Sequence, residues 1–137
     1  MLNLEFLMKK GYTEKQLAES SVLNLSFKQI ETINELEFNI FNVKLSKLWL
    51  SNNQIKTIDE KLFGECINLE ELYLDNNKLT TIDSNAFQQL KQLKVLRLNN
   101  NQIETIDGKI FEKCSKLKWL YLDNNKLREI NRDTFHT

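Results

Sequence analysis

Residues 69–87 contain the pattern that decides the fold: Leu69-Glu70-Glu71-Leu72-Tyr73-Leu74-Asp75-Asn76-Asn77-Lys78-Leu79-Thr80-Thr81-Ile82, with Phe87 five residues later. The same frame of apolar residues and Asn returns every 24 residues, because equivalent segments begin at Leu45, Leu93 and Leu117. A weaker copy precedes them, in which Lys28 stands in place of the Asn. A fixed period of this length is typical of proteins built from stacked structural repeats.

The spacing within each copy predicts a short strand. Leu48 and Leu50 are two residues apart, so both side chains lie on one face of a strand and Trp49 points to the opposite face. One such turn cannot bury its own Leu and Phe side chains. Stacked neighbouring turns make one continuous core, so the repeats are expected to fold together.

This pattern resembles the leucine-rich repeat family, and its length with a late Phe is similar to the "typical" subclass common in animal extracellular receptors. The resemblance covers about residues 20–135. It implies an α/β leucine-rich-repeat solenoid, a curved right-handed coil. Short parallel strands would line its concave face, with turns or short helices on its convex face.

The chain divides into an expected helical N-terminal cap, residues 1–19, and a repeat domain, residues 20–137. Its repeats span about 20–44, 45–68, 69–92, 93–116 and 117–137, the last incomplete. Thr13 and Gln16 form the pattern of a capping box for a short helix ending near Glu19. Before it, an apolar helical face ends near Gly11, and its residues are Leu2, Leu4, Phe6, Leu7 and Met8. A helix lying on a membrane surface is the alternative for this segment.

Two polar positions recur inside the repeat and have structural explanations. A short amide side chain can bond to the backbone where the chain leaves each strand, which predicts an internal ladder of Asn53, Asn77, Asn101 and Asn125. A second aligned set suits N-caps of convex turns, as does Asn34 with Glu37: Asp59, Asp83, Asp107 and Asn131. With one carboxylate per turn, metal binding is not expected.

The two cysteines, Cys66 and Cys114, occupy the same apolar position two repeats apart. Two strand spacings separate them by roughly 10 Å, beyond the reach of about 7 Å between α-carbons in a disulfide. We therefore expect free, buried thiols. Extracellular members of the family usually carry disulfide caps, so a cytoplasmic or host-delivered protein is favoured, with an extracellular one as the alternative. The sequon Asn24-Leu25-Ser26 adds little.

Composition argues against several classes of function. The chain of 137 residues has 19 basic and 19 acidic side chains, which gives no bulk attraction to nucleic acid. No apolar run approaches the roughly 20 residues of a membrane span, so no membrane insertion is expected. Its only histidine is His136, near the terminus, and it has no Gly-rich phosphate loop and no Cys/His pair. We expect no catalysis, no cofactor and no metal.

The best functional signal is the outward face of the predicted strands. Trp, Tyr and Arg often dominate binding energy at protein interfaces, and a row of them on a sheet surface has no core to explain it. The alternative is that they stack on one another as strand residues do. The candidate partner-binding residues are Trp49, Tyr73, Arg97, Trp119, Tyr121, Lys47, Glu71, Asp75 and Asp123.

The sequence therefore predicts a non-catalytic module that binds a protein or peptide on its concave face. Its repeats are similar to those of bacterial effector proteins that act on host proteins. The alternative is a fragment of an extracellular recognition receptor that binds a microbial ligand or a receptor chain. Self-association through an uncapped C-terminal end is a further expectation, because terminal repeats need a polar outer face.

Overall fold

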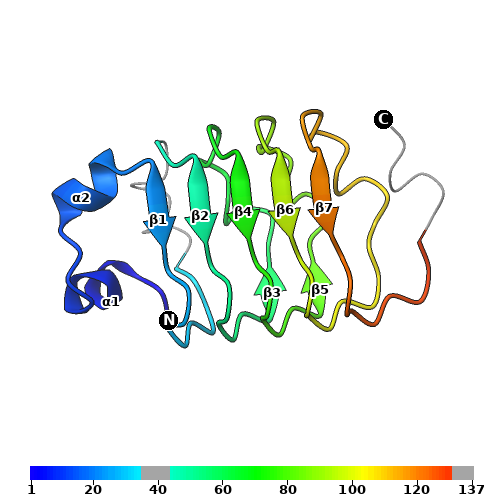
Figure 1. The fold of residues 1–137 in the computed structure, drawn as a ribbon, viewed down its shortest axis with the longest axis horizontal. Helices are drawn as coiled ribbons and strands as arrows, with labels where there is room; N and C mark the ends of the chain where they lie inside the picture. Colours follow the sequence, from blue (N-terminus) through cyan, green and yellow to red (C-terminus); the bar gives the residue numbers. More distant parts are fainter. Residues whose placement is uncertain (35–43, 131–137) are drawn as a thin grey trace.

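The computed structural model describes residues 1–34 and 44–130 as a solenoid built on a parallel sheet (Figure 1). Five strands form this sheet in the order β1 (Val22–Asn24), β2 (Lys47–Trp49), β4 (Glu71–Tyr73), β6 (Val95–Arg97) and β7 (Trp119–Tyr121). A second, two-stranded sheet pairs β3 (Thr57–Ile58) with β5 (Thr81–Ile82). The expected caps by Glu37 and Asn131 lie outside the described residues.

The register of the main sheet follows the 24-residue period. Leu48 pairs with Leu72, Leu72 with Leu96 and Leu96 with Leu120, so each turn advances the coil by one strand. The Leu side chains that point inward from β2, β4 and β6 have no exposed surface. The solenoid with parallel strands that the sequence predicted is confirmed.

Behind the sheet, the core continues through a row of stacked rings. The Phe87 ring centroid lies 6.2 Å from that of Phe63 and 6.4 Å from that of Phe111. The segments carrying these rings are turns, and an Asp carboxylate opens each of them. Asp59 accepts from the backbone N–H groups of Lys61 and Leu62, and Asp83 and Asp107 accept from the N–H two residues ahead. These bonds hold the turns that return the chain to the next strand.

Two short helices, α1 (Leu4–Lys9) and α2 (Glu14–Glu19), stand at the β1 end of the solenoid (Figure 1). The capping box of Thr13 and Gln16 is present, as predicted. Leu7 and Leu17 are buried, and Leu2 pairs with Ile33 in an isolated parallel bridge. Met8 was expected on the apolar face of α1 but is 46% exposed, since it lies about a third of a turn from the buried Leu7.

Asn side chains connect each turn to the one before it. The Asn77 amide donates to the carbonyl oxygens of Leu50 and Leu74, at 2.9 and 3.1 Å, and its oxygen accepts from the Ile55 N–H at 3.1 Å. Asn101 and Asn125 repeat this pattern one and two turns later. Asn53 also accepts from the Lys28 N–H, so it serves the turn that has no Asn of its own.

The residue before each of these Asn side chains has a left-handed backbone. Asn52, Asn76, Asn100 and Asn124 have φ between 55° and 57°. Asn tolerates this region better than other non-glycine residues, which is why the chain turns here without glycine. In the first turn the equivalent residue is Phe27, with φ 58° and 75% of its surface exposed. A bulky side chain in this region is strained.

Cys66 and Cys114 are both free and buried, as predicted. Burial raises the pKa of the Cys66 thiol to about 12 and that of the Cys114 thiol to about 11. A raised pKa leaves little nucleophilic thiolate near neutral pH. The two cysteines therefore act as small apolar side chains in the core.

Asn77→Ala should lower the free energy of unfolding by about 1 to 3 kcal/mol, because it leaves the buried Ile55 N–H without a partner and removes one of the two Asn donors to the carbonyls of Leu50 and Leu74. Asn125→Ala is the matched control, since Asn125 makes equivalent bonds in a less buried turn. Urea denaturation followed by circular dichroism measures both. Equal, small losses in the two variants would contradict the role of burial in this network.

Phe27→Asn should raise the free energy of unfolding by about 0.5 to 1 kcal/mol, because Asn relieves the strain of the left-handed backbone. Phe27→Ala is the control, since it removes the exposed ring without favouring that conformation. The two urea midpoints are compared directly. A midpoint for Phe27→Asn no higher than that of Phe27→Ala would show that the backbone here carries no relievable strain.

Candidate functional site

The outward side chains of the five-stranded sheet form two rows, and the strand register sets them. We call this surface the concave face. One row has Val22, Lys47, Glu71, Val95 and Trp119, and the other has Asn24, Trp49, Tyr73, Arg97 and Tyr121. Both rows cross all five strands. The register therefore brings the candidate aromatic and charged residues together on one surface.

The second row forms a continuous stack across four strands. The Trp49 and Tyr73 rings are stacked with centroids 5.3 Å apart and planes 20° apart. The Arg97 guanidinium carbon lies 5.4 Å from the Tyr73 ring centroid and 4.8 Å from that of Tyr121. Such contacts orient each side chain. The cross-strand stacking that we considered as the alternative is therefore present.

Stacking does not remove these side chains from solvent. Trp119 is 53% exposed and Tyr121 is 38% exposed, while Trp49, Tyr73 and Arg97 are half-buried. Inward neighbours such as Leu72 and Leu96 have no exposed surface, so the core is complete without the outward row. The stack leaves an ordered, partly apolar surface open to contact.

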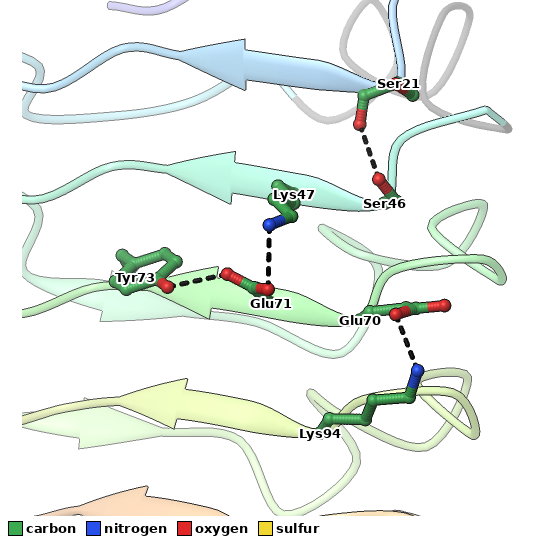
Figure 2. A network of polar contacts seen from close by, with 7 residues as sticks. All are labelled: Ser21, Ser46, Lys47, Glu70, Glu71, Tyr73 and Lys94. Atoms are coloured by element: carbon green, nitrogen blue, oxygen red, sulfur yellow. Dashed lines mark hydrogen bonds and ion pairs between the residues drawn. The ribbon is translucent and has the colours of Figure 1, made fainter.

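Polar contacts organise the β2–β4 half of the concave face. Lys47 Nζ lies 3.0 Å from Glu71 Oε1, and the Tyr73 hydroxyl donates to Glu71 Oε2 at 2.7 Å (Figure 2). The Tyr73 hydrogen bond, with help from Lys47, lowers the pKa of Glu71. Burial, followed by the hydrogen bond to Glu71 and its charge, raises the pKa of Tyr73 to about 12. Charges in this half are therefore matched within the chain.

A parallel row at the starts of the strands is also internally paired. Glu70 Oε2 lies 2.7 Å from Lys94 Nζ, and the Ser46 hydroxyl donates to the Ser21 carbonyl (Figure 2). Both partners in the Glu70–Lys94 pair are substantially exposed, so the pair stabilises the fold little. It does pair the charges of Glu70 and Lys94 at this edge of the sheet.

The two candidate aspartates differ from one another. Asp75 is only 8% exposed, because its carboxylate accepts from the Ser51 hydroxyl at 2.7 Å and from the Asn76 amide at 2.9 Å. Asp123, in the equivalent position of the last repeat, is exposed. Both were expected beside the aromatics as contact residues. Asp75 offers little surface for such a contact, because its position lies two turns further inside the solenoid.

Sequence reasoning named Arg97 as a candidate contact residue but missed Asn99, and each of them carries a buried polar atom. Arg97 Nε and Asn99 Oδ1 are buried, and neither has a hydrogen-bond partner in the part of the chain that the structure describes. A buried polar atom without a partner is unusual in a native protein. Asn99 could have been found from the repeat, since it occupies the position of Asp75 and Asp123.

The described residues contain neither a cluster that could hold a metal ion nor a helix that could span a membrane. Across residues 1–34 and 44–130, no three His, Cys, Asp or Glu side chains gather where they could hold a metal ion. The helices α1 and α2 have six residues each, and no helix in the described ranges is long and apolar enough to cross a membrane. The concave face is therefore the surface with the most distinctive chemistry.

Comparisons with known proteins agree with this architecture. A family model described as "Leucine rich repeat" matches residues 43–103 and 91–137. The crystal structure of the leucine-rich repeat domain of APL1B is similar, with a TM-score of 0.78 and 26% sequence identity. The match covers 96% of this chain and 39% of that chain, so this chain spans well under half of its length.

A search among curated proteins finds no match. The two family-model matches together run from residue 43 to residue 137, which is more than half of the chain. Domains with this fold are generally protein-interaction modules and are generally not catalysts. From its repeat pattern, its coil of parallel strands and these matches, the chain belongs to the leucine-rich repeat family.

Proposed function

We propose that this chain is a non-catalytic module that binds a protein or peptide on its concave face. The observation that carries the proposal is the ordered stack of Trp49, Tyr73, Arg97 and Tyr121, which is partly exposed and lies outside the core. Side chains of these types dominate the energy of many protein interfaces. Because the stack already restricts their motion, binding would lose less conformational entropy here than at flexible side chains.

The size of the surface limits the partner. Four strand spacings of about 4.8 Å give a concave face roughly 20 Å wide. One helix or one loop of a partner would fill this width. Trp119 is the most exposed aromatic residue on the concave face, so the β6–β7 half offers a partner the largest apolar contact.

Two classes of protein are consistent with this binding role. We favour an effector-type protein that acts on host proteins, because both cysteines lie in the core as free thiols. A fragment of an extracellular recognition receptor that binds a microbial ligand or receptor chain is the alternative. Expression of the protein with and without an oxidising compartment, followed by thiol titration and binding assays, would discriminate between the two.

Self-association at the C-terminal end is a second proposal, which rests on β7. Within residues 1–34 and 44–130 it is an edge strand of the sheet, and its inward Leu120 is half-buried, whereas Leu96 on β6 has no exposed surface. Pairing with a second copy would bury this Leu and the strand edge. Light scattering should show a mass that rises from one chain toward two with concentration. A constant mass of one chain up to about 100 µM would contradict this proposal.

The Trp49→Ala/Tyr73→Ala double variant should lose partner binding by about tenfold or more, because it removes two stacked side chains from the concave face. Affinity capture from a host-type lysate, read by mass spectrometry, identifies proteins held by the wild-type chain. Titration of each purified protein then measures the loss. Ile67→Ala is the control, since Ile67 is exposed but lies outside the sheet.

Urea denaturation of the double variant separates binding from folding. Its fold should remain intact, because the inward Leu side chains of β2 and β4 are unchanged. A variant that loses most of its stability yet binds as the wild type does would assign the stack to the fold. Equal binding by wild type and double variant would place the partner away from the β2–β4 half of the concave face.

A further inference from the structure

Among the charged side chains in the two outward rows of the concave face, only Arg97 has no ion-pair partner within the described residues. Lys47 pairs with Glu71, and Lys94 pairs with Glu70 (Figure 2). Arg97 has no carboxylate within ion-pair distance among residues 1–34 and 44–130. Its only described side-chain contacts are the rings of Tyr73 and Tyr121. A guanidinium carries five N–H donors, so Arg97 is a positioned cation without an acceptor.

The two rings explain why this cation is ordered without a counter-ion. They flank the guanidinium from the strands on either side of β6, and cation–π attraction holds it there. The N–H groups of a guanidinium lie in one plane, and a carboxylate binds best along an edge of that plane with two parallel hydrogen bonds. A side chain held in this way is prepared to bind a carboxylate.

Further groups lie beside Arg97 along the same strand direction. Two residues before it is Val95, which pairs in register with the 53% exposed Trp119 and so makes an apolar patch. Two residues after it, past the end of β6, is Asn99, whose Oδ1 is buried away from a docking segment. Beyond Asn99, the exposed carboxylate of Asp123 would favour a donor and repel a second acid. Along β6 the outward order is therefore an apolar residue followed by a cation.

We propose that the β6–β7 half of the concave face binds an acidic segment of a protein, with an Asp or Glu carboxylate of that segment on Arg97. An apolar side chain two residues away contacts Val95 and Trp119. The spacing suits an extended segment, because side chains two residues apart in a strand, such as Val95 and Arg97 of β6, repeat about every 6.7 Å. This inference rests on the proposed function and names its partner chemistry.

The test is selection of a phage-displayed library of random 12-residue peptides on the folded chain. Peptides selected by the wild type should share an Asp or Glu with an apolar residue two positions away. As synthetic peptides, they should bind Arg97→Gln about tenfold or more weakly, because the variant keeps the polar side chain but loses the charge. Arg128→Gln is the matched control, since Arg128 is exposed, pairs with Glu104 and lies outside the five-stranded sheet.

A charge exchange makes the test specific to the ion pair. Arg97→Glu should reject the selected peptides and bind versions in which the acid is replaced by Lys. Urea midpoints of every variant establish that each remains folded. Arg97→Lys keeps the charge without the planar fork, so its affinity should lie between those of the wild type and Arg97→Gln.

Four outcomes would overturn the inference. Peptides bound equally by the wild type and Arg97→Gln, but lost by Trp119→Ala, would leave the concave-face function standing and remove the acidic partner. Peptides unaffected by either variant, or no enriched peptides, would contradict this inference, and the former would also move binding off the β6–β7 half. Displacement of selected peptides by millimolar inorganic phosphate or by oligothymidine would indicate a phosphate ligand instead.

Discussion

The structure depends on hydrogen bonds between the Asn amide of one turn and the backbone of its neighbours. Each strand of the solenoid leaves carbonyl and N–H groups at its end that no sheet partner satisfies, and Asn77 alone bonds to Leu50, Leu74 and Ile55. These bonds join consecutive turns, so no repeat can complete its hydrogen bonds by itself. The stacked Phe rings and the inward Leu residues add apolar burial to the same connection. The free energy of unfolding therefore depends on the contacts between neighbouring repeats and not on any single repeat.

This arrangement frees the outward side chains of the sheet from any part in the core. Their positions are fixed by the strand register, yet their identities can vary without disturbing Leu48, Leu72 or Leu96. In this chain the free positions carry aromatic rings, paired charges and one unpaired Arg. The stack contains the rings of Trp49, Tyr73 and Tyr121 and the guanidinium of Arg97. It stays partly exposed to solvent. A rigid face with an unmatched cation at its centre is the physical basis of the function that we propose.

Most of the fold could be predicted from the sequence, because the 24-residue period gives each Leu, Asn and Phe position of the repeat the same surroundings in every turn. The helix cap at Thr13 and the free state of Cys66 followed from local rules and from strand spacing. The details of the concave face could not be predicted in the same way. The sequence does not show that Asp75 bonds to Ser51 or that Arg97 lies between two rings. Both contacts depend on side-chain rotamers and on neighbours one repeat away. The left-handed backbone at Asn52 and Asn76 likewise depends on the geometry at the end of the strand.

The two tryptophans of the chain, Trp49 and Trp119, both lie on the concave face, so their indole N–H groups report on it without interference from the core. A ¹H–¹⁵N correlation spectrum of the labelled chain, titrated with a purified partner, tests the central claim most directly. If the concave face is the binding surface, saturation should shift the indole signals, that of the more exposed Trp119 most strongly. Saturation by a bound partner that leaves both indole signals unmoved would contradict the account.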